Sequence, residues 1–180
     1  MRIQAYAIGL LAALLLTMGL AGCGNRESQA DSQPGAEPET AQVYLAGPFF
    51  NEEEIKNVEY VESILDAHGF SYFSPIRHSA EAEPGTAEWS DQIFEMDKNE
   101  LGKADFVVAL YYGSNSDSGT AWECGYASAK GVPVILVHVY RDGDSNLMMH
   151  SGCTTNVYLE DLAEYDFVTM PVYEYDGRMY

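Results

Sequence analysis

The sequence contains little positive charge. It has 9 Lys and Arg residues against 28 Asp and Glu residues, which gives a formal net charge of −19 at pH 7. A chain of this charge is repelled by the phosphates of nucleic acids, so we expect no nucleic acid partner. The acidity indicates good solubility and points to no other class of partner.

Cysteine and histidine are also scarce, and neither forms a metal-binding pattern. The three cysteines make no Cys-x-x-Cys motif, and the four histidines show no ligand spacing, so we predict no metal site. Cys124 and Cys153 could pair in an extracytoplasmic protein. Because Cys124 falls in a predicted buried helix, however, we expect two unpaired thiols.

The sequence lacks the glycine-rich loops that bind phosphate. YLAGPFF, from Tyr44, is not a Gly-x-Gly-x-x-Gly motif, and SDSGTAWE, from Ser116, lacks the Lys-Ser/Thr pair of a Walker sequence. No motif therefore implies a bound phosphate.

Long apolar runs are absent except at the amino terminus. Residues 1–22 hold Arg2 and then an apolar stretch that leads to Leu-Ala-Gly before Cys23, as in a secretory signal. A plain transmembrane anchor is the alternative, but the run is short for a span of about 20 residues. Leu-Ala-Gly-Cys resembles a bacterial lipobox. We therefore expect a lipoprotein signal peptide at 1–22, a lipid on Cys23, and an extracytoplasmic location at the cell membrane.

The segment after this signal has no apolar periodicity. Residues 23–41 are rich in Gly, Pro, Ser, Gln and Glu, a composition that cannot bury enough surface to offset its ordering entropy. We interpret it as a flexible tether. Residues 42–180 then form one globular domain.

Apolar runs alternate with helical spacings along residues 42–180. Strands are predicted at Gln42–Leu45, Phe70–Ser74, Asp105–Tyr112, Val132–Val139 and Asp166–Met170. Helices are predicted at Asn51–Ala67, Trp89–Gly102, Ser118–Lys130 and Thr155–Leu162. This order predicts an α/β fold of the flavodoxin/Rossmann-like type, a parallel five-stranded sheet flanked by helices. The loops after the first three strands then meet at one edge, where such folds bind ligands.

Two acids, Asp117 and Glu123, lie where the third strand gives way to a helix. Thr120 and Glu123 fit a capping box, which would make the glutamate structural. Alternatively, a glutamate in the first turn is kept anionic by the helix dipole and can act as the nucleophile of a glycosyl transfer.

Other acidic and aromatic residues are ambiguous by themselves. Asp97, on the second helix, taken alone is a solvated helix acid. Phe49 and Phe50 are either core residues or a platform on which a planar base stacks.

Several separated motifs, taken together, resemble one enzyme family. YLAGPFF, the acid at Asp97, DSGTAWECGYA and NLMMHSG occur in the order found in nucleoside 2-deoxyribosyltransferases, and the resemblance covers residues 43–180. The family implies a flavodoxin-like fold, 2′-deoxynucleosides and free nucleobases as substrates, and no cofactor. It implies that Glu123 is the nucleophile, that Asp97 protonates the base, and that Tyr44 positions the nucleophile.

The resemblance also implies a set of substrate-binding residues and an oligomer. Asn146 matches an asparagine that a neighbouring subunit contributes, so a homo-oligomer, a hexamer or a dimer, is expected. The expected substrate-binding residues are Gly47, Phe49, Phe50, Asp117, Asn146 and Tyr180. Two alternatives stay open: a hydrolase acting on 2′-deoxynucleosides or their 5′-phosphates with the same nucleophile, and a lipoprotein that binds nucleosides without catalysis.

Overall fold

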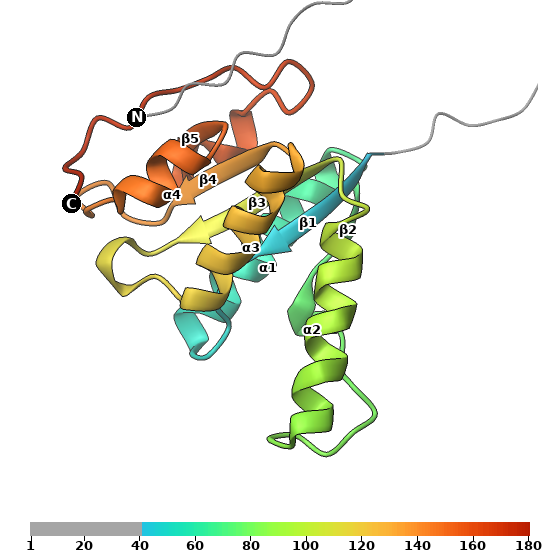
Figure 1. Ribbon diagram of the computed structural model, residues 1–180. Helices are drawn as coiled ribbons and strands as arrows, with labels where there is room; N and C mark the ends of the chain where they lie inside the picture. Colours follow the sequence, from blue (N-terminus) through green and yellow to red (C-terminus); the bar gives the residue numbers. More distant parts are fainter. Residues whose placement is uncertain (1–40) are drawn as a thin grey trace, which may run out of the picture. The chain divides into compact units, whose positions relative to one another are not determined.

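A computed structural model describes residues 41–180 (Figure 1). The predicted signal peptide at 1–22, the lipidated Cys23 and all but the last residue of the 23–41 tether lie outside the described residues. In the part that is described, none of the helices has the length and apolar character needed to cross a membrane.

The described residues form a five-stranded sheet in which every neighbouring pair is parallel. The strand order is β2-β1-β3-β4-β5, the flavodoxin-like order, so the predicted fold class is confirmed. The strands are β1 (Gln42–Ala46), β2 (Ser71–Phe73), β3 (Phe106–Tyr111), β4 (Val134–His138) and β5 (Thr155–Tyr158). The strand order reverses between β1 and β3: β2 lies on one side of β1, and β3, β4 and β5 lie on the other. Such a reversal point is where this fold binds ligands.

Helices cover both faces of the sheet because the strand residues are apolar on both sides. Alternate strand residues pack against α1 (Glu52–Ala67) and the 3-10 helix η3 (Leu159–Glu164) on one face. The others pack against α2 (Ala87–Leu101), α3 (Ser118–Lys130) and α4 (Leu147–Gly152) on the opposite face. Tyr44 belongs to this second face, beneath α3.

Capping residues account for the helix ends that the sequence predicts correctly. Asn51 accepts hydrogen bonds from the backbone N–H groups of Glu53 and Glu54, which starts α1. The chain leaves α3 at Gly131, whose φ of 76° is in the left-handed region that glycine adopts without strain.

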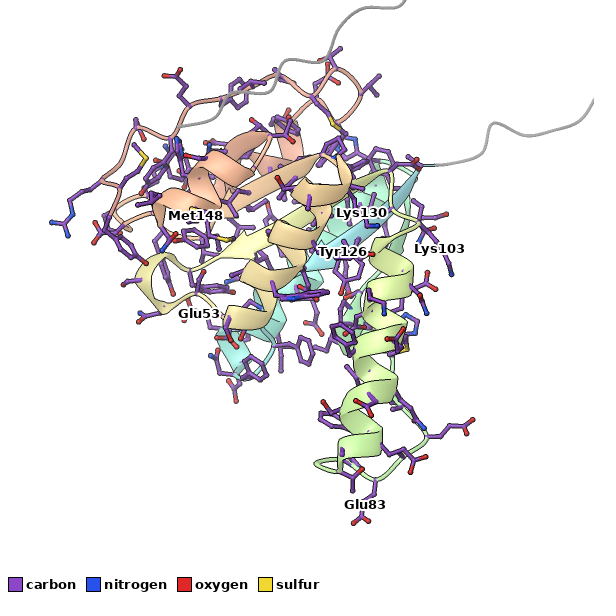
Figure 2. The ribbon with its side chains drawn as sticks, in the orientation of Figure 1. Glu53, Glu83, Lys103, Tyr126, Lys130 and Met148 are labelled. Carbon is purple, nitrogen blue, oxygen red and sulfur yellow. The ribbon has the colours of Figure 1, made fainter. Side chains whose placement is uncertain are left out.

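Helix α2 lies at the edge of the domain, and most of it does not contribute to the core. Of its residues, all of which the structure describes, only Leu101 is buried. Figure 2 shows α2 running from the loop at Glu83 to the turn at Lys103. The amino-terminal half of α2 therefore carries its inward side chains toward a cavity instead of the core.

The sequence-based prediction is wrong near the carboxyl terminus. Residues 155–158 form strand β5, not the start of a helix, and residues 159–164 are a 3-10 helix. The strand predicted at Asp166–Met170 is a turn. There the Asp166 carboxylate accepts the backbone N–H groups of Val168 and Thr169, and Met170 has a φ of 44°. The short helix α4 was not predicted.

Candidate active site

Glu123 is held by a tyrosine from the adjacent strand. Tyr44 is fully buried on β1, and its hydroxyl donates a 2.6 Å hydrogen bond to Glu123 Oε1 on α3. Burial, and then the charge of Glu123, raise the pKa of Tyr44 well above its usual value, so the phenol stays protonated and serves as the donor. The structure thus brings Tyr44 and Glu123 into contact, as the family resemblance implied.

The charge state of Glu123 differs from the expectation. Burial raises the pKa of Glu123 to about 7, the Tyr44 hydrogen bond lowers it, and the charges of Asp97 and Asp117 raise it further. Glu123 is the sixth residue of α3, beyond the first turn in which the helix dipole acts most strongly. The predicted preference for the anion is therefore wrong, and near neutral pH the carboxyl group exchanges between both forms.

Asp97 is an inward-facing acid of α2 and not a solvated one. Burial raises the pKa of Asp97 to about 6, while the charge of His78 lowers it. Its Oδ1 atom is buried and finds no hydrogen-bond partner among residues 41–180. Asp97 and Glu123 line the same cavity of about 360 Å³ between α2 and α3. The structure thus brings together two carboxyl groups whose pKa values lie near neutral pH, as acid–base chemistry requires.

Aromatic side chains that the sequence analysis did not single out form the walls of this cavity. Trp89 and Phe94 come from α2, and Trp122 directly precedes Glu123. The Phe94 and Trp122 rings meet edge to face with centroids 5.2 Å apart. Such apolar walls suit a planar, weakly polar ring such as a nucleobase. In the sequence, these wall residues could have been recognised as aromatic residues that lie close to Asp97 and Glu123 on helix faces that are only partly buried.

Asp117 caps α3, which corrects the capping-box interpretation. Its Oδ2 accepts the backbone N–H of Thr120 at 2.9 Å, so Asp117 and not Thr120 is the N-cap. A side chain at Gly119 would lie 2.7 Å from the same oxygen, which explains the glycine within DSGT. The Glu123 carboxyl group therefore takes no part in capping α3.

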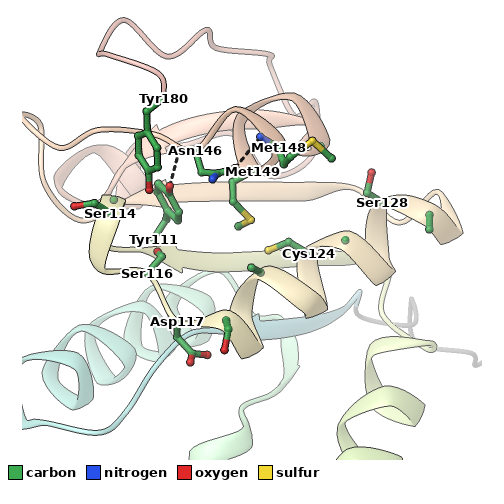
Figure 3. Close-up of a pocket in the computed structure, with 16 residues that line it drawn as sticks. Tyr111, Ser114, Ser116, Asp117, Cys124, Ser128, Asn146, Met148, Met149 and Tyr180 are labelled. Atoms are coloured by element: carbon green, nitrogen blue, oxygen red, sulfur yellow. Dashed lines mark hydrogen bonds between the residues drawn. The ribbon is translucent and has the colours of Figure 1, made fainter.

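Asp117, Asn146 and Tyr180 line a second cavity of about 520 Å³ on a different side of α3 (Figure 3). Neither Asp97 nor Glu123 lines it. Asn146 caps α4 by accepting the Met148 backbone N–H at 2.9 Å, and its own N–H donates to the Tyr111 hydroxyl at 2.7 Å. Within one chain, the predicted site residues therefore line two different cavities: Asp97 and Glu123 line one, and Asp117, Asn146 and Tyr180 line the other.

Tyr180 is placed by pairing of the carboxy-terminal segment with the loop before α4. The Tyr180 N–H donates to the Ser145 carbonyl at 3.0 Å, and the Leu147 N–H donates to the Tyr180 carbonyl at 3.1 Å. Upstream, the Tyr175 ring stacks flat on the buried His138 ring with centroids 4.2 Å apart. The segment is thus tied to the domain at both ends, and Tyr180 has a defined position beside Asn146.

The remaining predicted residues follow β1. A side chain at Gly47 would come within 3.0 Å of the Leu110 Cβ atom, so close packing against β3 explains this glycine. The rings of Phe49 and Phe50 stack on each other at 5.6 Å, and Phe50 is 74% exposed. Neither ring lines the cavity of Asp97 and Glu123, and their contact with a base remains a prediction.

The two cysteines of the described part are free thiols, as predicted. Burial raises the pKa of Cys124 to about 12 and that of Cys153 to about 11, so neither is a thiolate near neutral pH. Among residues 41–180, no three or more His, Cys, Asp or Glu side chains gather in a way that could hold a metal ion.

Comparison with known proteins gives consistent matches. A model of the family described as nucleoside 2-deoxyribosyltransferase matches residues 43–157. The nucleoside deoxyribosyltransferase of Limosilactobacillus fermentum is 30% identical over 129 residues, covering 63% of this chain and 77% of that protein.

Solved structures agree. The structure of a 2-deoxyribosyltransferase from Bacillus psychrosaccharolyticus is similar with a TM-score of 0.69 and 35% identity, covering 75% of this chain and 99% of the other. A conserved protein from Enterococcus faecalis V583 has a TM-score of 0.58 and 25% identity, covering 69% and 96% of the two chains. The family match spans more than half of the sequence and includes Tyr44, Asp97, Asp117 and Glu123, so the chain belongs to the nucleoside 2-deoxyribosyltransferase family.

Proposed function

We propose that the protein transfers 2-deoxyribose from one nucleobase to another by a retaining double displacement with Glu123 as the nucleophile. One observation carries the proposal: Tyr44 holds the Glu123 carboxyl group at a cavity that also contains a second carboxyl group, Asp97. Membership of the family supports the substrate class.

In the first displacement, a Glu123 oxygen attacks C1′ of the deoxynucleoside and forms a glycosyl ester. The bond between C1′ and the base nitrogen breaks, its electron pair stays on the base, and Asp97 supplies the proton that the leaving base needs. In the second displacement, a nitrogen of the incoming base attacks C1′, Asp97 takes up a proton, and Glu123 leaves as a carboxylate. Two inversions at C1′ restore the starting configuration.

The paired carboxyl groups suit this sequence of steps. Because Asp97 and Glu123 interact electrostatically, the two carboxyl groups titrate as a coupled pair, and the protonation of one changes the pKa of the other. The productive form carries the proton on Asp97 and the charge on Glu123. The hydrogen bond from Tyr44 shifts the pair toward this distribution by stabilising the Glu123 anion, against burial, which holds the pKa of Glu123, about 7, above that of Asp97, about 6. The anion in turn stabilises the oxocarbenium-like transition state.

The two cavities favour nucleosides over nucleotides. Among the described residues that line them, none is Lys or Arg, and the second cavity carries Asp117. A 5′-phosphate would find no cation to pair with and a carboxylate nearby. This observation supports transfer between nucleosides over the alternative of a hydrolase for 5′-phosphates.

The test is base exchange by the purified protein. Incubated with 2′-deoxyadenosine and free cytosine, it should form 2′-deoxycytidine, and 2′-deoxyadenosine 5′-monophosphate should react at least roughly tenfold more slowly. Chromatography of the products measures both. Free deoxyribose released at a rate that added base does not change would instead establish a hydrolase, and binding without turnover would establish a nucleoside-binding protein.

We also propose a homo-oligomer in which Asn146 of the partner subunit completes the site. In one chain Asn146 lies at a different cavity from Glu123, and the neighbouring Met148 is 73% exposed. The two inactive variants Glu123→Gln and Asn146→Ala, refolded together, should regain activity, since one hybrid site then has both residues. Mixtures as inactive as their parents would contradict a shared site.

We further propose that the protein is exported and held at the outer surface of the membrane by a lipid on Cys23. The support is the sequence around Cys23, outside the described residues. Labelled fatty acid should be incorporated into the wild type and not into Cys23→Ser. Equal labelling of both, or no labelling, argues against the anchor.

A further inference from the structure

The last residues of the chain, 171–180, form a strap that begins beside the edge strand β5 (red in Figure 1). The Asn156 backbone N–H donates to the Tyr173 carbonyl at 3.2 Å, and the Tyr173 N–H donates to the Thr155 hydroxyl at 2.9 Å. These two bonds fix the beginning of the strap. The end of the strap, which carries Tyr180, is placed by other contacts.

His138 is buried against the middle of this strap. It is the last residue of β4, and its ring stacks on the Tyr175 ring with centroids 4.2 Å apart and planes 6° from parallel. The Asn156 amide nitrogen donates to the Tyr173 carbonyl, which leaves the amide oxygen as an acceptor. His138 Nε2 lies 2.9 Å from that oxygen and therefore carries the proton. The imidazole is thus bonded to β5 and supports the strap.

The same imidazole contacts the ring that holds Asn146. The ring of Tyr111, the last residue of β3, meets His138 edge to face at 5.4 Å, and its hydroxyl accepts the Asn146 N–H at 2.7 Å. The end of the strap pairs with the same loop, since the Tyr180 N–H donates to the Ser145 carbonyl at 3.0 Å. Figure 3 shows Tyr111, Asn146 and Tyr180 together at the second cavity. One buried ring therefore contacts both of the elements that place Asn146 and Tyr180.

We propose that His138 is a positioning residue whose ring holds Asn146 and Tyr180 where the neighbouring subunit needs them. The inference rests on the proposed function and on the shared site, in which Asn146 of the partner subunit serves Glu123. His138 lines neither of the two cavities, so it acts through its aromatic neighbours and contacts no substrate. Loss of His138 should therefore damage the part of the site that a chain lends, and spare the chain's own Glu123 and Asp97.

The test combines variants whose damage lies in different parts of the shared site. His138→Ala should lower base exchange by roughly 10- to 100-fold, the usual cost of a small misplacement of groups that bind substrate. Refolded together with Glu123→Gln, it should exceed the mean of the two variants several-fold, because a hybrid site combines an intact Glu123 with a well-placed Asn146. Refolded with Asn146→Ala, it should stay at the mean, because both chains then lend a damaged part.

A second measurement needs no catalysis. Hydrogen exchange followed by NMR should be at least roughly tenfold faster at the Tyr180 and Leu147 amides of His138→Ala, and unchanged at the amides of β1. Tyr175→Ala removes the other ring of the stack and should behave alike in both measurements, so it replaces His138→Ala if that variant does not fold. His68→Ala, which removes an exposed histidine at the end of α1, should match the wild type.

Three results would overturn the proposal. Rescue of His138→Ala by Asn146→Ala would place the damage in the chain's own part of the site. Rescue by neither variant would mean that His138 does not act through a lent part. Amide exchange at Tyr180 that keeps its wild-type rate would show that the strap does not depend on the ring. A wild type without base exchange would reject the proposed function, and the amide exchange rates would then decide the role of His138.

Discussion

Replacing Glu123 by Gln should abolish base exchange, with a loss of at least roughly 1000-fold in turnover, because an amide cannot form the glycosyl ester. The substitution keeps the size of the side chain and an oxygen that accepts the Tyr44 hydroxyl, so the fold should persist. Intact-protein mass spectrometry with a 2′-deoxynucleoside should show a deoxyribosyl adduct on the wild type and none on the variant.

Glu95→Gln is the matched control for this substitution. Glu95 is an exposed acid of α2 whose partner is Lys98, and it lines neither cavity described above. Its loss should leave exchange and adduct formation unchanged. An adduct that persists in Glu123→Gln would mean that another group is the nucleophile, and the double displacement through Glu123 would then be wrong.

The same reaction should depend on pH through the ionisation of Glu123. The anion is the attacking form and the pKa of Glu123 is raised to about 7, so the rate of adduct formation should fall as the pH drops below 7. Tyr44→Phe removes a hydrogen bond that stabilises the anion. The acid limb of the pH–rate profile, in which the rate falls as Glu123 becomes protonated, should therefore move to higher pH by roughly one unit. Rapid-quench measurement of the adduct across pH 5 to 9 tests both statements, and an unmoved limb would show that Tyr44 does not tune the nucleophile.

The sheet and the helices up to residue 139 could be predicted because their local signals agree. Buried strands β3 and β4 appear as continuous apolar runs, Asn51 marks the start of α1, and Gly131 marks the end of α3. After β4 the signals conflict, since the four residues Thr155–Tyr158 are too few to distinguish a strand from the start of a helix. The apolar residues around Val168 belong to a turn that depends on one carboxylate, Asp166.

The site was predictable only in part, because its contacts join distant segments. Tyr44 and Glu123 are 79 residues apart, and only the family resemblance connected them beforehand. Burial, which sets the charge of Glu123, is a property of the packed α2–α3 pair and leaves no mark on the local sequence.

Replacing Asp97 by Asn should slow exchange of ordinary 2′-deoxynucleosides by roughly 100- to 10,000-fold, the usual contribution of a general acid. The loss should be much smaller for a 7-methylated purine deoxynucleoside. Its base already carries a positive charge and departs without a proton. The comparison needs only the rate of adduct formation with the two substrates, measured for the wild type and the variant.

Asp97→Asn should also change the pKa of the nucleophile, Glu123, an effect that is expected only if the two acids lie close together. The charge of Asp97 raises the pKa of Glu123, so its removal should lower that pKa and move the acid limb of adduct formation to lower pH. With the methylated substrate, which bypasses the acid, Asp97→Asn should therefore react faster than the wild type between about pH 6 and 7, where Asp97 is ionised in the wild type and Glu123 is still partly protonated. Equal losses with both substrates, together with an unmoved limb, would show that Asp97 shapes the cavity and neither donates the proton nor acts on Glu123.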